Sequence, residues 1–323
     1  MHIVITGAGG FLGARLARRL AERGTLRGEP LGQLTLLDLA PPAAPEASCP
    51  VATRACDISD PAALAASVPE DADVIFHLAA VVSAHAEEVF EDGMAVNLTG
   101  TLNLLERCRA LPVSPVLVYA SSIAVMGGDV PSPIRDWTAT TPQTSYGTQK
   151  AVGELLLNDY SRRGFVDGRG FRLPTISVRP GKPNRAASSF MSSIIREPLQ
   201  GQEAVCPVGP DYAHYYLSPR RCIENLIRGA ELPAEALGAF RVMQMPGRTS
   251  TIGEMVAAMT AVAGPEPARL IRWERAPEIE GILAGWRGHF EPERALALGL
   301  EADASFEENV AIFIEEELGG APG

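Results

Sequence analysis

The chain has 323 residues, a formal net charge of −11 at pH 7 and 46% hydrophobic residues. It is long enough to bury a large core and lies near the size at which one domain becomes two. The acidic balance and the lack of a long basic run argue against a nucleic-acid partner. No apolar run approaches the roughly 20 residues of a membrane-spanning helix, so we expect no membrane partner.

The cysteines and the N-terminus predict a cytoplasmic setting. Five cysteines, an odd number with no Cys-x-x-Cys pair, indicate a reducing compartment without disulfide bonds or a zinc site. No His, Asp and Glu cluster has the spacing of metal ligands, so we expect no metal. The first residues enter a strand directly, which predicts that there is no signal peptide.

The first forty residues predict a dinucleotide-binding turn. An apolar strand, Ile3–Ile5, precedes a glycine-rich turn and an amphipathic helix. The glycines are Gly7, Gly9, Gly10 and Gly13. They would let backbone N–H groups reach a pyrophosphate at the start of the helix. The next strand, 34–38, ends at Asp38, whose carboxylate would accept the ribose hydroxyls of NAD and repel the 2′-phosphate of NADP; the alternative is a tight turn with an ordinary surface aspartate.

Apolar segments and helical patterns alternate along the first part of the chain. The predicted strands are 51–56, 73–80, 116–120 and 175–178, and the predicted helices are 61–68, 87–108 and 146–162. Asp60 is expected to cap the helix 61–68. This alternation is typical of an α/β fold with a Rossmann-type, doubly wound parallel sheet.

Beyond Gly181 the strands are harder to identify. We expect strands at 240–245 and 270–273 and helices at 252–262, 291–298 and 306–318. The chain is therefore predicted to divide into an NAD-binding domain, 1–181, and a smaller substrate-binding region, 182–323, that is partly interleaved with it.

A serine pair and a Tyr-x-x-x-Lys motif carry the predicted chemistry. Ser121 and Ser122 end the strand 116–120 at the carboxyl edge of the sheet, where open α/β folds bind ligands. Tyr146 and Lys150 are four residues apart and share one helix face. A neighbouring ammonium and a positively charged nicotinamide would lower the pKa of the phenol, so that it could accept a proton from an alcohol. The alternative is that Tyr146 and Lys150 lie on a helix surface and have no catalytic role.

These features resemble the extended short-chain dehydrogenase/reductases, the NAD-dependent epimerase/dehydratase family. The spacing Gly7-x-x-Gly10-x-x-Gly13 is this family's, and the match covers residues 3–180 and, more loosely, the rest of the chain. The resemblance implies that the catalytic residues are Ser122, Tyr146 and Lys150. It implies NAD contacts at Gly7, Gly10, Phe11, Leu12, Gly13, Asp38, Asp57, Ile58, Leu78, Ala79, Ala80, Asn97, Tyr146, Lys150 and Pro180.

The resemblance also suggests roles within the cofactor set. Asp57 and Ile58 would hold the adenine, although a surface aspartate beside a core isoleucine is the plain alternative. Asn97 would support Lys150 through its backbone and a water molecule. Pro180 follows the last predicted strand, at the end that lies beside the nicotinamide.

Two departures from the nucleotide-sugar members of the family concern the substrate. Met126 stands where they usually carry a tyrosine, and His214 replaces an arginine that helps to hold a diphosphate. The run 181–190 resembles the sugar-acid dehydrogenases, which implies NAD-dependent oxidation of the 2-hydroxyl of a four-carbon aldonate such as D-erythronate to the 2-oxo acid. The candidate substrate residues are Ser83, His85, Ser122, Tyr146, Asn184, Arg185 and Ser188. Arg185 is the expected carboxylate-binding residue, because a guanidinium is planar and bidentate.

Several alternatives stay open at this point. The same residues could serve a nucleotide-sugar 4-epimerase that releases no NADH, a dehydrogenase of another small alcohol, or a non-catalytic NAD-binding regulator. For assembly, the family commonly pairs the helices 87–108 and 146–162 across a two-fold axis. Val152, Leu155 and Leu156 are apolar enough for such a face, so we expect a homodimer.

Overall fold

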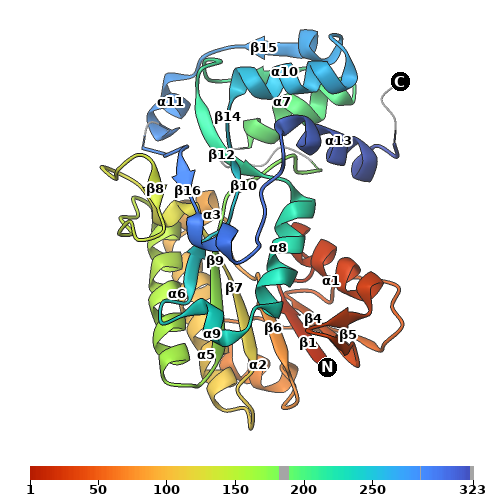
Figure 1. Ribbon diagram of the computed structural model, residues 1–323, viewed down its shortest axis with the longest axis vertical. Coiled ribbons are helices and arrows are strands. Elements are labelled where there is room, and N and C mark those ends of the chain that lie inside the picture. The colour runs from red at the N-terminus through yellow and green to blue at the C-terminus, as the bar shows by residue number, and fades with distance from the viewer. Residues whose placement is uncertain (182–188, 284, 321–323) are drawn as a thin grey trace. The chain divides into compact units, whose positions relative to one another are not determined.

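A parallel sheet forms the centre of the first half of the protein. The computed structural model describes residues 1–181, 189–283 and 285–320. The strands of this sheet are β1 (His2–Thr6), β4 (Gln33–Asp38), β5 (Val51–Ala55), β6 (Val74–His77), β7 (Val116–Ser122), β9 (Asp167–Leu173) and β13 (Val242–Gln244). Seven strands lie in the order β13-β9-β7-β6-β1-β4-β5 (Figure 1), with parallel pairing on both sides of β1. The prediction of a Rossmann-type doubly wound sheet is confirmed, and the strand order reverses between β1 and β6.

The chain folds into two compact, interleaved units. The first unit comprises Met1–Val125, Thr144–Arg172 and Ile223–Gln244. The second unit comprises Met126–Gln143, Leu173–Cys222 and Met245–Gly323. Apart from Leu173 at the end of β9, the parallel sheet therefore belongs to the first unit.

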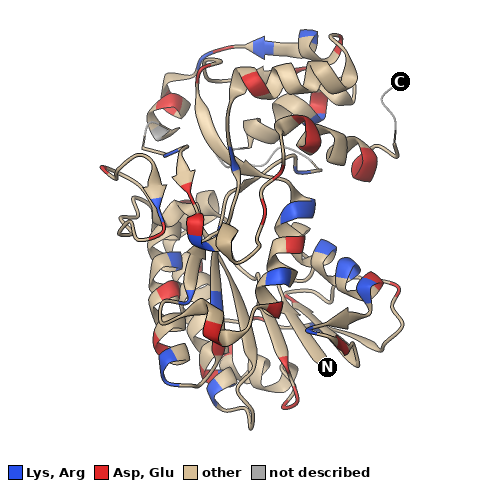
Figure 2. Cartoon of the chain, viewed as in Figure 1, with Lys and Arg blue, Asp and Glu red and all other residues tan. Residues whose placement is uncertain are grey.

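Helices cover both faces of the sheet in the first unit (Figure 1). They are α1 (Phe11–Arg23), α2 (Pro61–Ser67), α3 (Ser83–Glu88), α4 (Phe90–Gly93), the π-helical turn η1 (Met94–Gly100), α5 (Thr101–Arg109), α6 (Ser145–Arg162) and α9 (Ala234–Leu237); the unit also holds the 3₁₀ turn η2 (Ile123–Val125), the hairpin β2 (Thr25–Leu26) with β3 (Glu29–Pro30), and most of α8 (Pro219–Glu231). Apolar side chains of α2, α5 and α6 form one buried cluster with the strands. The strands β1, β6 and β7 carry no charged residue, as Figure 2 shows, because both of their faces are buried.

The cap predicted for α2 is confirmed, and α6 has a cap that was not predicted. Asp60 caps α2, since its Oδ1 accepts a hydrogen bond of 2.8 Å from the N–H of Ala62. Thr144 caps α6, since its Oγ1 accepts a hydrogen bond of 3.0 Å from the N–H of Gly147.

Of the three apolar residues assigned to a dimer face, Leu155 is 67% exposed, whereas Val152 and Leu156 are half-buried. The homodimer stays a prediction.

Two predicted elements need correction. The helix predicted at 87–108 is confirmed from Phe90 to Arg109 as α4, η1 and α5, but it does not begin at Glu87, which lies in α3 before a break at Val89. The strand that completes the sheet beside β7 is β9, not the predicted segment 175–178, whose residues Thr175–Ile176 form β10 in a separate sheet. β9 was not predicted, because its charged residues leave no apolar run. The charge of Arg169 is accepted in this buried strand because its guanidinium donates to the carbonyl oxygens of Ala230 and Leu232 at 2.8 and 2.9 Å.

The second unit combines small sheets with helices around its own core. Its strands are β8 (Ile134–Arg135), β10 (Thr175–Ile176), β11 (Ala204–Cys206), β12 (Ala213–Leu217), β14 (Arg248–Thr251), β15 (Ile271–Trp273) and β16 (Phe290–Glu291), and its helices are α7 (Phe190–Leu199), α10 (Ile252–Ala263), η3 (Pro267–Leu270), α11 (Pro277–Leu283), α12 (Glu293–Ala297) and α13 (Phe306–Glu317). The predicted helices 252–262, 291–298 and 306–318 and the strand 270–273 are confirmed within a few residues. None of the helices in the described ranges is long and apolar enough to cross a membrane.

A substitution at Gly13 tests how closely α1 packs against the turn that follows β1. A Cβ at Gly13 would overlap the carbonyl of Gly7, which is backbone and cannot move away cheaply. We expect Gly13→Ala to lower the free energy of unfolding by about 1–3 kcal/mol, as overpacking does. Gly281→Ala is the matched control, since nothing lies within 4 Å of its Cβ position and alanine favours a helix. Urea unfolding of both variants measures this, and equal stabilities would contradict the packing.

Candidate active site

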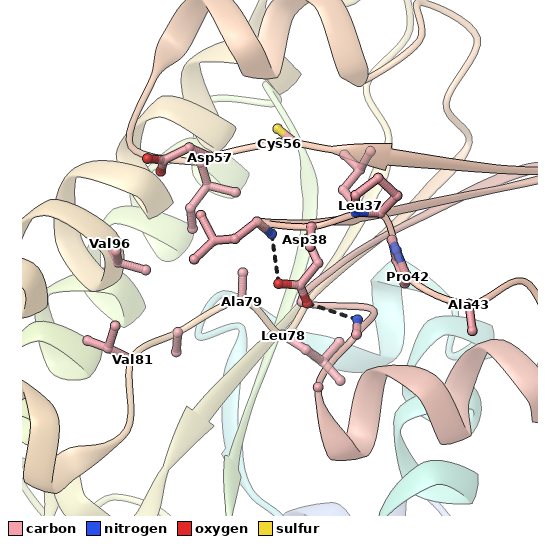
Figure 3. A pocket seen from close by; sticks show the side chains of 18 residues that line it. Leu37, Asp38, Pro42, Ala43, Cys56, Asp57, Leu78, Ala79, Val81 and Val96 are labelled. Atoms are coloured by element: carbon pink, nitrogen blue, oxygen red, sulfur yellow. Dashed lines mark hydrogen bonds between the residues drawn. The ribbon is translucent and has the colours of Figure 1, made fainter.

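A cavity of about 590 Å³ opens at the carboxyl ends of the first strands of the sheet. It is lined by Gly7, Gly9, Gly10, Leu37, Asp38, Leu39, Ala40, Pro41, Pro42, Ala43, Cys56, Asp57, Ile58, Leu78, Ala79, Ala80, Val81 and Val96 (Figure 3). Eight of the predicted cofactor residues are in this lining: Gly7, Gly10, Asp38, Asp57, Ile58, Leu78, Ala79 and Ala80. This is the edge of an open α/β sheet where dinucleotides bind.

The carboxylate of Asp38 lines this cavity and binds the backbone of the glycine turn. Its Oδ2 accepts a hydrogen bond from the N–H of Gly9, and its Oδ1 accepts one from the N–H of Leu39, both at 2.8 Å (Figure 3). A Cβ at Gly7 would meet the backbone of Ala79, so the turn and the end of β6 lie against each other. The residues fit a dinucleotide with free ribose hydroxyls, because among the described lining residues no lysine or arginine could neutralise a 2′-phosphate.

Some of the predicted cofactor residues lie outside this lining, and one part of the lining was not predicted. Phe11, Leu12, Gly13 and Asn97 are not in the described lining of the cavity. The segment 39–43, to which no role was assigned from the sequence, forms one of its walls. Ile58 is only 4% exposed and packs mainly in the core, while Asp57 Oδ1 accepts hydrogen bonds from Ser59, so the adenine roles of both stay predictions.

The catalytic side chains predicted from the sequence meet at the end of β7. Ser122 is the last residue of β7, and Tyr146 lies in the first turn of α6. Lys150 is 2% exposed, and its Nζ donates a hydrogen bond of 2.8 Å to the carbonyl oxygen of Ala120. The same Nζ lies 5.8 Å from the centre of the Tyr146 ring. One strand end and one helix face thus bring a hydroxyl, a phenol and an ammonium together.

Without a bound nicotinamide, Lys150 alone does not ionise Tyr146, and the predicted joint effect of the two positive charges stays a prediction. Burial raises the pKa of Tyr146 to about 12, and the hydroxyl of Ser122 opposes this rise. Burial also lowers the pKa of Lys150 to about 8, against the influence of the carboxylate of Glu154. At pH 7 the phenol is therefore neutral and the ammonium is charged. The phenolate needs an additional positive charge, such as the nicotinamide ring of NAD would bring.

Asn97 links the end of β6 to α6. Its Oδ1 accepts a hydrogen bond of 2.9 Å from the N–H of Val81, and its Nδ2 donates one of 2.8 Å to Oε1 of Gln149. Its backbone carbonyl accepts a hydrogen bond of 2.7 Å from Oγ1 of Thr101. The side chain of Asn97 thus holds the neighbour of Lys150 in the chain, and the water bridge to Lys150 stays a prediction.

A buried ion pair behind the site was missed in the sequence. Arg172 of β9 donates to both carboxylate oxygens of Glu154, with Nη2 to Oε2 at 2.8 Å, and both side chains are 3% exposed. Ser121 donates a hydrogen bond of 2.5 Å to Oε1 of the same carboxylate. The position of Glu154, four residues after Lys150, is the only signal that the sequence offers for it.

The residues assigned to the substrate are only partly located. Asn184, Arg185 and Ser188 lie outside the described residues. His85 Nε2 contacts Oδ2 of Asp92 at 2.7 Å on an exposed surface, and Ser83 begins α3. Pro180 follows β10 and not a strand of the parallel sheet, since the strand beside β7 ends at Leu173, and its contact with NAD stays a prediction.

His214, which replaces the diphosphate-binding arginine, is a buried neutral residue. Its Nε2 lies 2.7 Å from Oγ1 of Thr175, and burial lowers its pKa to about 3. A neutral imidazole cannot supply the charge with which an arginine binds a diphosphate. Across the described part of the chain, no group of three or more His, Cys, Asp and Glu side chains could hold a metal ion.

The known proteins that are similar to this chain carry several descriptions. The model of the NAD dependent epimerase/dehydratase family matches residues 3–215. A D-erythronate dehydrogenase of Cupriavidus necator is 51% identical over 98% of this chain and 98% of its own length. A D-erythronate dehydrogenase of Haemophilus influenzae is 42% identical over 98% of this chain and 100% of its own. A crystal structure from Agrobacterium tumefaciens, described as a nucleoside-diphosphate-sugar epimerase, is 48% identical with a TM-score of 0.96 and covers 100% of this chain and 96% of that one.

Removing the charge of Asp38 tests its part in cofactor choice. Asp38→Asn keeps an oxygen for the N–H of Gly9 but loses the negative charge. We expect NAD to bind roughly tenfold more weakly and the preference for NAD over NADP to fall by a similar factor, because a hydrogen bond to a charged group contributes about 1.5–3 kcal/mol. Asp57→Asn, in the same cavity, is the control and should leave the preference unchanged. Calorimetric titration measures both affinities, and wild-type protein that binds the two cofactors equally would contradict the assignment.

Proposed function

Because this chain belongs to the NAD-dependent epimerase/dehydratase family, we propose that it is a dehydrogenase that oxidises the 2-hydroxyl of a small sugar acid with NAD. The family predicted from the sequence is confirmed, and with it the prediction of an enzyme. The single observation that carries the proposal is the set of Ser122, Tyr146 and the buried Lys150 at the sheet edge. A regulator that only binds NAD has no use for all three.

The proposed substrate is a four-carbon aldonate of the D-erythronate type. Two relatives with 51% and 42% identity over nearly the full chain are D-erythronate dehydrogenases, which supports this choice. The neutral, buried His214 argues against a diphosphate in the substrate. The product would be the corresponding 2-oxo acid.

The residues of the chain supply the proton chemistry. Ser122 and Tyr146 would hold the substrate hydroxyl by hydrogen bonds, and the phenolate oxygen of Tyr146 would accept its proton. The charge of Lys150 favours that phenolate. The glycine turn and Asp38 would hold NAD, which supplies the acceptor for the hydride that leaves C2. Loss of the proton and the hydride turns the alcohol into a ketone.

A nucleotide-sugar epimerase is the second candidate. The crystal structure that is 48% identical to this chain is described as a nucleoside-diphosphate-sugar epimerase, which favours it. An epimerase would use the same residues but return the hydride to the opposite face of the ketone, so no NADH would be released. The two candidates therefore differ in a product that can be measured.

An absorbance assay for NADH decides between the candidates. Purified protein is mixed with NAD and, in turn, erythronate, threonate, a uronate and a UDP-sugar. We expect NADH in equal amount to a 2-oxo acid with a four-carbon aldonate, and none with the UDP-sugar. Conversion of a UDP-sugar without net NADH would support the epimerase instead. Tight NAD binding without turnover of any compound would support the regulator.

Removing the phenol hydroxyl tests the proposed proton acceptor. We expect Tyr146→Phe to lower kcat by at least about 100-fold, as loss of a general base does, while NAD still binds. In the wild type the oxidation rate should rise with pH, because the phenol of Tyr146 starts neutral and must lose its proton before it can accept one from the substrate. The rise should end near pH 8, where Lys150 loses its charge. Tyr160→Phe, on the same helix, is the control and should keep its activity. Near-normal turnover of Tyr146→Phe would exclude this acceptor.

A further inference from the structure

The ammonium of Lys150 lies against the faces of two aromatic rings. Its Nζ is 4.9 Å from the centre of the Tyr119 ring and 5.8 Å from that of Tyr146. Both distances are within the roughly 6 Å over which a ring face attracts a cation. The hydrogen bond to the carbonyl of Ala120 uses only one of the three N–H donors of the ammonium. The attraction is strong in such a place, because Lys150 is almost entirely removed from water.

The Tyr119 ring also stacks on the imidazole of His77. The two ring centres are 5.7 Å apart, with an angle of 27° between the planes. His77 is neutral, since burial and the charge of Lys150 lower its pKa to about 3. Its Nδ1 lies 2.8 Å from Oγ1 of Thr6, and its Nε2 lies 3.0 Å from Oγ1 of Thr101. The imidazole therefore supports the Tyr119 ring without bringing a second positive charge near Lys150.

The directions of these hydrogen bonds fix the tautomer of His77. Thr101 Oγ1 donates its one hydrogen to the carbonyl of Asn97 at 2.7 Å, so it accepts a hydrogen bond from Nε2 of His77. Nδ1 then accepts from the hydroxyl of Thr6. Every polar atom of the imidazole is satisfied in this neutral form, which holds the ring in one orientation.

The hydroxyl of Tyr119 points away from this contact. It is buried and makes no well-aligned hydrogen bond with a described residue, although the side chain of Thr101 lies within its reach. A Cβ at position 153 would overlap this hydroxyl, so Gly153 of α6 allows the helix to approach the ring. The ring face of Tyr119, and not its hydroxyl, is therefore the part that meets the ammonium of Lys150.

We propose that Tyr119 is a positioning residue whose ring face holds the ammonium of Lys150 beside Tyr146 and favours its charged form. The other charged groups around Lys150 are Glu154 on α6 and, bound to that carboxylate, Arg172 on β9. Arg172 partly neutralises Glu154, so this carboxylate attracts the ammonium of Lys150 less strongly than a free carboxylate would. The ring of Tyr119 supplies a second attraction for the same ammonium. The kinetic part of this inference rests on the proposed dehydrogenase, while the titration of Lys150 does not.

Titration of Lys150 by NMR tests the inference without any substrate. The chain contains only two lysines, Lys150 and Lys182, so ¹⁵N-lysine labelling gives two Nζ signals, which Lys182→Arg assigns. Loss of a cation–π contact changes a protonation equilibrium by roughly 3- to 30-fold, so in Tyr119→Leu the pKa of Lys150 should fall by about 0.5–1.5. Tyr119→Phe, which keeps the ring and loses only the hydroxyl, should titrate as the wild type does.

Kinetics provide the second readout. In Tyr119→Leu we expect kcat for the sugar acid to fall by roughly 3- to 30-fold and KM to change little. The pH above which activity declines should also be lower than in the wild type, because Lys150 would lose its charge at lower pH. Tyr119→Phe should restore both kcat and the pH profile. If no sugar acid is oxidised by the wild type, the proposed function fails, but the NMR titration still decides the role of Tyr119.

An outcome in which Lys150 titrates identically in folded Tyr119→Leu and in the wild type would overturn the inference. Circular dichroism checks that the variant is folded. If Tyr119→Leu does not fold, replacement of Tyr119 by pentafluorophenylalanine keeps the ring shape and reverses its quadrupole. The pKa of Lys150 should then fall as well, and an unchanged value would contradict the proposed role of the ring.

Discussion

Lys150 is a buried lysine with a positive charge, and the residues of the candidate active site are arranged around that charge. Removing an ammonium from water favours its neutral form, which is why its pKa is low. The carbonyl of Ala120, the carboxylate of Glu154 and the ring of Tyr119 each oppose this effect. The end of β7 and one face of α6 supply these groups. The positions of the predicted catalytic residues therefore depend on how α6 packs on the sheet.

The same packing explains the second layer of the site. Glycine at position 153 lets α6 approach Tyr119, and Arg172 reaches Glu154 from β9 on the other side. A buried carboxylate without its arginine would be costly, so strand β9 is tied to the active site as well as to the sheet. The cofactor cavity is built separately, from the turn after β1 and the ends of β4, β5 and β6. Asp38 joins two of these segments through the N–H groups of Gly9 and Leu39.

Much of this arrangement follows from local sequence signals. The glycine turn, Asp38, the serine pair and the Tyr-x-x-x-Lys spacing each depend on residues close together in the chain, and each could be placed on a strand end or helix face. Strand β9 could not be found in this way, because Arg169 and Arg172 are acceptable in a buried strand only through partners far away in the chain. The break at Val89 has no proline or glycine to mark it.

The electrostatic properties of the site also required the structure. A lysine four residues from a tyrosine predicts a lowered phenol pKa, but burial of the ring raises it in the unliganded protein. The role of the proline-rich segment 39–43 as a cavity wall depends on where the loop folds back, which composition does not specify. His77 and Tyr119 look like ordinary strand residues until their contacts with Lys150 are known.

The fate of the hydrogen at C2 tests the proposed chemistry most directly. Erythronate carrying deuterium at C2 is incubated with NAD, and free NADH is analysed by mass spectrometry. A dehydrogenase places one deuterium in the released cofactor for each 2-oxo acid formed. Deuterium that remains in the substrate, with no labelled cofactor in solution while a UDP-sugar is epimerised, would contradict the proposed oxidation.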